Sequence, residues 1–253
     1  KKAAGKGRWT NICGPIGGAF TMLGVLAALI FVFFIGVEAV GEYSGLSLSQ
    51  ADKTNIFYFF GISGWVFTPV TRTITQAAIA ENMELVNAGL KPKNIYAYGF
   101  SRYHHIGGQG ATLPLAFYML RAKSKKFRTL GKATIIPSVF NINEPLQYGA
   151  VVGNPYMLIP TILIAIILPA NAYIWMKFGF ASINYVNFDM NFAPNAVSAF
   201  FMSGGDVRNI LLVCVNLLLA ALIWYPFFKA ADKAEYEKEE KRAAEKAAAR
   251  AAA

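Results

Sequence analysis

The apolar residues of this chain lie in long continuous blocks separated by short polar segments, and they do not alternate with polar residues. Four blocks approach the roughly 20 residues that a helix needs to cross the apolar core of a bilayer. They are residues 14–40, 56–80, 155–178 and 210–228, and the second is the weakest. The pattern predicts an all-α polytopic membrane protein with about four to six spanning helices.

Two further apolar stretches, residues 107–120 and 133–152, are short or interrupted by proline and glycine. Irregular backbone cannot face lipid, because its polar groups would lack partners there. Both stretches therefore fit re-entrant hairpins whose tips are covered by protein. The first assignment has an alternative, which is that residues 103–120 belong to an additional crossing of the membrane.

Composition and charge fit a membrane protein and give its expected orientation. The 253 residues are 55% apolar and only 15% charged, with a formal net charge of +10. Four positive charges precede residue 9, and six more lie in residues 121–132, with no acid in either segment. Because basic loops favour the cytoplasmic side, both segments are expected there, and residues after 80 are expected on the same side. The charge therefore indicates topology and argues against nucleic-acid binding.

These features suggest three parts along the chain. Residues 1–13 form a basic cytoplasmic start, residues 14–229 form a membrane transport domain, and residues 230–253 form a solvated helical tail in the cytoplasm. The tail is rich in Ala, Glu, Lys and Arg, with charge pairs at i,i+4 spacing. Both ends of the chain are thus expected in the cytoplasm. No cysteine or histidine cluster has metal-ligand spacing, so no metal or cofactor is expected.

One carboxylate lies within the second hairpin. Glu144 occurs in the stretch Asn-Ile-Asn-Glu-Pro-Leu-Gln-Tyr-Gly between two apolar segments. An ionisable group within a membrane segment is costly unless it faces a cavity or a partner. Glu144 is therefore expected to line a water-filled or ligand-filled cavity. The alternative is a structural acid that caps the neighbouring helix.

An ordered set of short motifs runs through the chain. The motifs are Phe-Gly-Ile-Ser-Gly at 60–64, Gly-Gly-Gln-Gly-Ala-Thr-Leu at 107–113, Phe-Asn-Ile-Asn-Glu-Pro at 140–145, Gly-Gly-Asp at 204–206 and Tyr-Pro-Phe-Phe-Lys at 225–229. In this order they resemble one family, the membrane component (enzyme IIC) of the phosphoenolpyruvate-dependent sugar phosphotransferase systems. The resemblance is to the lactose, cellobiose and chitobiose class, and to its carboxy-terminal, substrate-carrying half.

The resemblance implies a transporter that binds a mono- or disaccharide at mid-membrane and carries it to the cytosol of a bacterium, where a partner subunit phosphorylates it. Such a subunit has no catalytic residues of its own. Sugar hydroxyls favour charge-assisted hydrogen bonds from carboxylates and amides, and sugar rings pack on aromatic faces. The implied substrate-binding residues are Glu144, Asn143, Ser63, Asn141 and Phe192. Asn141 is expected to help by fixing the turn.

Two departures from the family pattern favour a second hypothesis. Ser63 stands where the family usually has histidine, and Asn-Phe-Ala-Pro-Asn at 191–195 replaces a stretch with a tryptophan. The chain could therefore be a non-transporting membrane assembly or interaction subunit that retains the carrier fold. Expected partners are the sugar, cytosolic phosphocarrier subunits docking on residues 121–132, a possible second membrane chain that supplies the missing half, and further copies in a homo- or hetero-oligomer.

Overall fold

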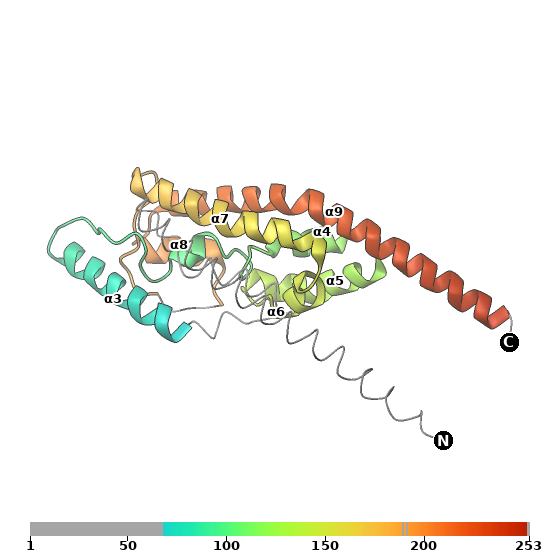
Figure 1. The fold of residues 1–253 in the computed structure, drawn as a ribbon. Coiled ribbons are helices and arrows are strands. Elements are labelled where there is room, and N and C mark those ends of the chain that lie inside the picture. Colours follow the sequence, from blue (N-terminus) through green and yellow to red (C-terminus); the bar gives the residue numbers. More distant parts are fainter. Residues whose placement is uncertain (1–67, 189, 191, 252–253) are drawn as a thin grey trace, which may run out of the picture. The chain divides into compact units, whose positions relative to one another are not determined.

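The structure is a computed structural model that describes residues 68–188, 190 and 192–251. The expected span 14–40, most of the span 56–80 and Ser63 lie outside this range. In chain order the elements are α3 (Thr68–Asn87), η2 (Phe100–Tyr103), α4 (Leu113–Leu120), α5 (Lys125–Val139), α6 (Glu144–Leu146), the π-helix η3 (Gln147–Val151), α7 (Pro155–Lys177), α8 (Asn195–Met202) and α9 (Val207–Ala251) (Figure 1). The described residues are thus mainly helical.

Two helices, α7 and α9, are long and apolar enough to cross a membrane. They coincide with the expected spans 155–178 and 210–228, and they lie side by side (Figure 1). Amide side chains join them, because Asn171 Nδ2 donates to Asn216 Oδ1 at 2.8 Å and Asn216 Nδ2 donates to the Leu168 carbonyl at 3.2 Å. Polar bonds of this kind between apolar helices fix their register.

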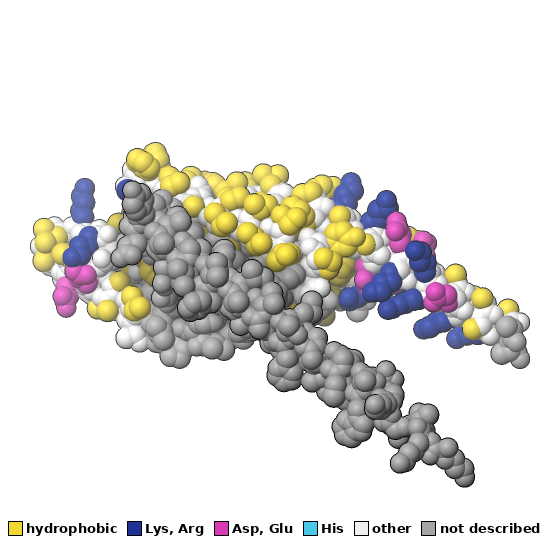
Figure 2. Space-filling view, viewed as in Figure 1, with side chains coloured by type: hydrophobic (Ala, Val, Ile, Leu, Met, Phe, Trp, Pro, Cys, Tyr) yellow, Lys and Arg dark blue, Asp and Glu magenta, His cyan; other side chains and the backbone are white. Residues whose placement is uncertain are grey.

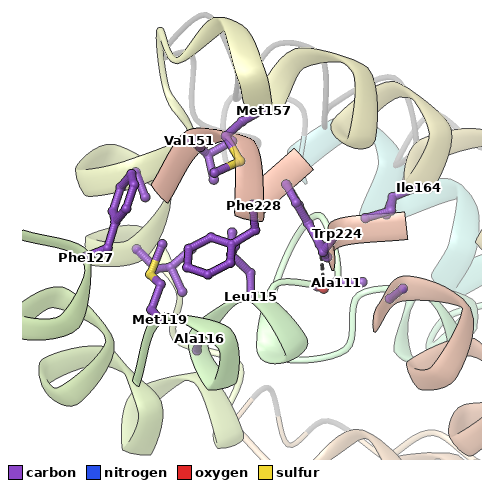
Figure 3. Close-up of a cluster of buried hydrophobic side chains, with 14 of the residues drawn as sticks. Ala111, Leu115, Ala116, Met119, Phe127, Val151, Met157, Ile164, Trp224 and Phe228 are labelled. Atoms are coloured by element: carbon purple, nitrogen blue, oxygen red, sulfur yellow. Dashed lines mark hydrogen bonds between the residues drawn. The ribbon is translucent and has the colours of Figure 1, made fainter. Parts of the chain in front are cut away.

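The main apolar core lies where α4, α5, α7 and α9 meet. Trp224 of α9 is fully buried in it, and Leu115, Met119, Phe127 and Met157 from the other helices belong to the same cluster (Figure 3). The indole N–H of Trp224 still needs a partner, as buried indoles do. It donates to the carbonyls of Gly110 and Ala111 at 3.3 and 3.1 Å.

Residues 103–123 run along α9 toward its carboxy-terminal part. Tyr103 contacts Asn209 and Asn216, Gly110 lies against Trp224, and Lys123 binds Asp232. At 1.5 Å per residue, the segment from Asn209 to Asp232 measures about 35 Å, the thickness of a bilayer core with its margins. The re-entrant hairpin expected at 107–120 and its alternative, an additional crossing at 103–120, both stay predictions, and the only α-helix of this stretch is α4.

The end of the structure opposite the basic segment 121–132 is held by buried polar side chains. Asn82 of α3 donates to the carbonyls of Asn94 and Asn184, both at 2.8 Å. The Tyr103 hydroxyl donates to Asn184 at 2.6 Å and accepts from Asn209 at 2.6 Å. Residues 82–94 thus lie near the amino-terminal end of α9. The expectation that they share the cytoplasmic side with the basic segment stays a prediction.

The second expected hairpin is present as helices. Residues 125–139 form α5, residues 140–143 form a turn, and α6 with η3 leads back toward the start of α7. Asn141 has a φ of 63°, a left-handed conformation that asparagine tolerates better than most residues. The turn places Glu144 as the first residue of α6, with Asn143 as its N-cap.

The helix α9 continues without a break through the expected boundary at residue 230, and two of its acids bind the amino-terminus of α5. Asp232 accepts from the backbone N–H groups of Lys123 and Ser124 at 2.8 and 2.9 Å. Glu239 accepts from the Ser124 hydroxyl at 2.7 Å and from the N–H groups of Lys125 and Lys126, both at 2.9 Å. The first half of the tail is thus docked, while residues 241–251 are exposed as expected.

These bonds also shift the titration of Glu239. Burial by itself would raise the pKa of this carboxyl, but the hydrogen bonds from Lys126, Lys125 and Ser124 outweigh burial and hold the pKa below its usual value. A carboxyl with a lowered pKa in the folded state stabilises the fold above its ordinary pKa of 4.5. That stabilisation is lost as the pH falls through the lower pKa of the folded protein.

We predict that Glu239→Gln lowers the stability of the detergent-purified protein at pH 7 by about 1 kcal/mol, the usual loss for a helix cap. The amide keeps one acceptor oxygen but loses the charge-assisted bonds. The difference between the variant and the unchanged protein should begin to shrink as the pH falls below about 4.5, where this carboxyl binds a proton in the unfolded chain, and should be lost below the lower pKa of the folded state. The midpoint of thermal unfolding measured between pH 3.5 and 7.5 tests this. Glu245→Gln, at an exposed position of the same helix, is the control, and an equal loss in both variants contradicts the prediction.

Candidate functional site

The candidate site is built on a glycine-rich loop, residues 107–112, which precedes α4. The N–H of Leu113 donates to the carbonyl of Ile106 at 3.2 Å, so the ends of the loop meet. Gly107, Gly108 and Gly110 have φ values of 78°, 96° and 83°, which glycine adopts at little cost. The loop leaves several backbone groups without helical partners, and each must find a partner elsewhere.

The amide of Asn143, in the turn before α6, supplies one of these backbone partners and also binds a side chain of the loop. Its Nδ2 donates to the Gln109 carbonyl at 2.7 Å and to the Thr112 hydroxyl at 2.8 Å. Gln147 Nε2 donates to the same Gln109 carbonyl at 2.7 Å. Both side chains are buried. They tie the glycine loop to the turn and helix that carry Glu144.

A second pair of amides binds the beginning of the loop. The N–H of Gly107 donates to Asn141 Oδ1 at 3.1 Å and to Asn195 Oδ1 at 3.3 Å. Asn141 Nδ2 then donates to the Ala193 carbonyl at 2.8 Å, and Asn195 Nδ2 donates to the Arg102 carbonyl at 2.7 Å. The loop is thereby joined to both the turn at 141 and the start of α8.

Glu144 is half-buried at the edge of this cluster. Within residues 68–188, 190 and 192–251, no hydrogen bond or ion pair joins its carboxylate to another residue, and no side-chain bond caps α6. A half-buried carboxylate held on a fixed turn can accept hydrogen bonds from a ligand. This is the chemistry that polyhydroxylated compounds require.

The structure brings together three of the five residues expected at the site: Asn141, Asn143 and Glu144. Phe192 precedes Ala193, which accepts the bond from Asn141, and its side chain is 62% exposed. Ser63 lies outside the described residues. The Asn141 side chain joins the turn to Gly107 and Ala193, and both N–H groups of the Asn143 amide are used within the protein. Asn143 therefore has only its carbonyl oxygen to offer a ligand.

Three residues of the site were not identified from the sequence: Gln147, Asn195 and Trp224. Gln147 is buried, and its Oε1 atom has no hydrogen-bond partner among the described residues. A buried acceptor without a partner is uncommon and costly. One feature of the sequence could have identified Gln147. It lies in an apolar segment three residues after Glu144, and this spacing places two helical residues on the same face. Nothing in the sequence pairs Asn195 with Gly107.

We predict that Gly108→Ala disrupts the site. A Cβ at Gly108 would overlap the Asn143 side chain, and alanine is also strained at this positive φ. Gly179→Ala is the matched control, because Gly179 has a φ of 77° but no atom within 4 Å of its Cβ position. Gly108→Ala should be less stable than the control by about 1–2 kcal/mol, since overpacking adds to the φ strain. Thermal unfolding in detergent measures the difference, and equal losses would show that Asn143 does not press on the loop.

Comparison with known proteins gives consistent matches. A family model described as "Phosphotransferase system, EIIC" matches residues 16–165. The lichenan permease IIC component of Bacillus subtilis is 33% identical over 206 residues, which are 79% of this chain and 45% of that protein. The lactose-specific EIICB component of Streptococcus mutans is 31% identical over 218 residues, 83% of this chain and 36% of that protein.

A solved structure is also similar. It is the crystal structure of the transporter ChbC, the IIC component of the N,N'-diacetylchitobiose-specific phosphotransferase system. The TM-score is 0.71 with 28% sequence identity, and the match covers 91% of this chain and 50% of that chain. The chain thus spans half or less of the length of these relatives.

Proposed function

Because the chain belongs to the EIIC family of the phosphotransferase system, we propose that it is a sugar transporter subunit of a phosphoenolpyruvate-dependent phosphotransferase system. It binds a mono- or disaccharide at mid-membrane and carries it to the cytosol for phosphorylation by a partner subunit. It lies in the bacterial cytoplasmic membrane as a multi-pass protein with both ends in the cytoplasm, in three parts: a basic start (1–13), a membrane domain (14–229) and a helical tail (230–253).

The observation that carries this proposal is the half-buried Glu144 carboxylate, which has no bonded partner in the described part of the chain. It accepts hydrogen bonds from sugar hydroxyls, and such bonds to a charged acceptor are about twice as strong as neutral ones. A charged acceptor held on a fixed turn suits a ligand with several hydroxyl donors.

The other residues have supporting roles in this proposal. Asn141 and Asn143 hold the glycine loop in place, and the Asn143 carbonyl oxygen faces the loop at Gly108. Phe192, which is largely exposed in the described structure, packs against a sugar ring. Ser63 offers a hydroxyl to the sugar in place of the histidine usual in the family.

Transport requires the glycine loop and the α5–α6 hairpin to carry the sugar toward the cytosol together, since amide bonds tie the two segments. Phosphorylation then falls to cytosolic phosphocarrier subunits, which dock on the basic residues 121–132. The subunit has no catalytic residues of its own. We further propose that it works as a homo- or hetero-oligomer, with a second membrane chain supplying the remaining half of the transporter.

The alternative function is a membrane assembly subunit that keeps the carrier fold without transport. Ser63 favours it, because serine replaces the usual histidine and cannot exchange a proton near neutral pH. An assembly subunit should co-purify stoichiometrically with other membrane chains and show no sugar dependence in its stability. Retention of Glu144, which has no bonded partner among the described residues, speaks for the transporter.

We predict that one sugar from a panel of mono- and disaccharides raises the thermal stability of the detergent-purified protein. At 100 times its dissociation constant a ligand adds about 2.7 kcal/mol. Glu144→Gln should abolish this gain, because the charged acceptor is lost, while the stability without sugar stays nearly unchanged. Glu84→Gln, an exposed acid of α3, is the control and should keep the full gain. If the gain survives Glu144→Gln undiminished, the site is elsewhere, and if no sugar gives a gain, the assembly function is favoured.

A further inference from the structure

A cavity of about 380 Å³ lies where the amino-terminus of α5, the end of η3, the start of α7 and the tail part of α9 meet. It is separate from the glycine loop, since none of residues 107–112 lines it. Its polar lining includes two lysines, one acid, two tyrosines and an asparagine: Lys126, Lys238, Glu235, Tyr148, Tyr156 and Asn154.

The cavity lies at the level where the apolar surface of the helices ends. On α7, exposed Ile159 and Ile166 follow it, while on α9 the exposed apolar residues Leu218 and Leu222 precede it. In Figure 2 the hydrophobic surface gives way here to a zone of Lys and Arg side chains. The two tyrosines of the lining are about half exposed, as aromatic residues at a membrane–water boundary often are. The cavity therefore opens where lipid headgroups lie.

The charge of the lining is positive. Asp232 and Glu239 are close by, but their carboxylates are bound to the backbone N–H groups at the start of α5. Glu235 remains, and its contact with Lys126 is long, at 3.8 Å. No ion pair joins Lys238 to an acid within the described residues. Two ammonium groups thus face the cavity region against one carboxylate.

We propose that this cavity binds the phosphate group of an anionic phospholipid. Basic pockets between membrane helices on one side of a bilayer recognise such headgroups. Lys126 and Lys238 hold the phosphate, and the hydroxyls of Tyr148 and Tyr156 can donate to its remaining oxygens. The acyl chains extend over the exposed apolar side of α7 from Ile159 onward. That adjoining apolar surface favours a lipid over a free phosphate ion, and the site does not depend on the proposed transport function.

Binding of phosphatidylglycerol to the full chain, measured by native mass spectrometry from detergent, tests the proposal. Each lysine near a headgroup contributes about 1 kcal/mol, so the double variant Lys126→Gln, Lys238→Gln should bind about 30-fold more weakly. Phosphatidylcholine should bind far less than phosphatidylglycerol to the unchanged protein. The control is Lys123→Gln, Lys233→Gln, which removes two exposed lysines from the same two segments without touching the cavity.

Three results overturn the proposal: equal loss of phosphatidylglycerol in the test and control variants, equal binding of the two lipids, or thermal stabilisation by inorganic phosphate alone that vanishes in the test variant. The last result would identify a site for soluble phosphate. If the double variant does not fold, Lys238→Gln alone, at an exposed position of α9, should still weaken binding about fivefold.

Discussion

The structure depends on one constraint, which is that irregular backbone among apolar helices needs a hydrogen-bond partner for every buried polar group. The chain leaves helical geometry between Tyr103 and Leu113, and again at 140–143. Backbone carbonyls meet the requirement at the turn, while side-chain amides and one indole meet it at the glycine loop. The amides and the indole come from Asn141, Asn143, Gln147, Asn195 and Trp224. These residues belong to four different segments, so satisfying the backbone also fixes the segments against one another.

The same principle operates at both ends of the segment formed by residues 103–123. At one end the Tyr103 hydroxyl joins Asn184 and Asn209. At the other, Asp232 and Glu239 bind the N–H groups that begin α5. The long helix α9 contributes to both ends and to the middle, through Trp224. The helix α9 therefore aligns the glycine loop and the α5–α6 hairpin with each other. Glu144 lies at the end of a turn that has little freedom to move. Glu144 is tolerated there without a bonded partner among the described residues, because its neighbours Asn143 and Gln147 make the hydrogen bonds that hold the fold.

The sequence predicted the elements that depend on composition alone. The apolar runs at 155–178 and 210–228 coincide with α7 and α9, and the hairpin around Asn141 was located by its proline and polar residues. The path of residues 103–123 along α9 was not predicted, because no continuous apolar run marks it and its course depends on contacts with α9. The docking of the tail was also missed. Acids at i,i+7 spacing look like a solvated helix until the basic segment, more than 100 residues earlier, is brought beside them.

The site shows the same division between local pattern and tertiary contact. Glu144 stood out as a charged residue in an apolar segment, and the family resemblance added Asn143 and Asn141. Asn195 and Gln147 could not be assigned, since an amide in isolation gives no indication of which distant carbonyl it will bind. Asn143 looked like a ligand contact, whereas its amide nitrogen binds the loop. Polar residues near a site thus divide into those that hold the backbone and those left for a ligand, and only the fold tells them apart.

The most direct measurement of the central claim is an experimental structure of the full chain in lipid with a bound disaccharide. The account predicts sugar density beside α6, with at least one hydroxyl within about 3 Å of a Glu144 carboxylate oxygen. The bonds from Asn143 to Gln109 and from Gly107 to Asn141 should remain as they are without sugar. A sugar bound away from Glu144, or a glycine loop released from Asn143 when the sugar binds, would contradict it.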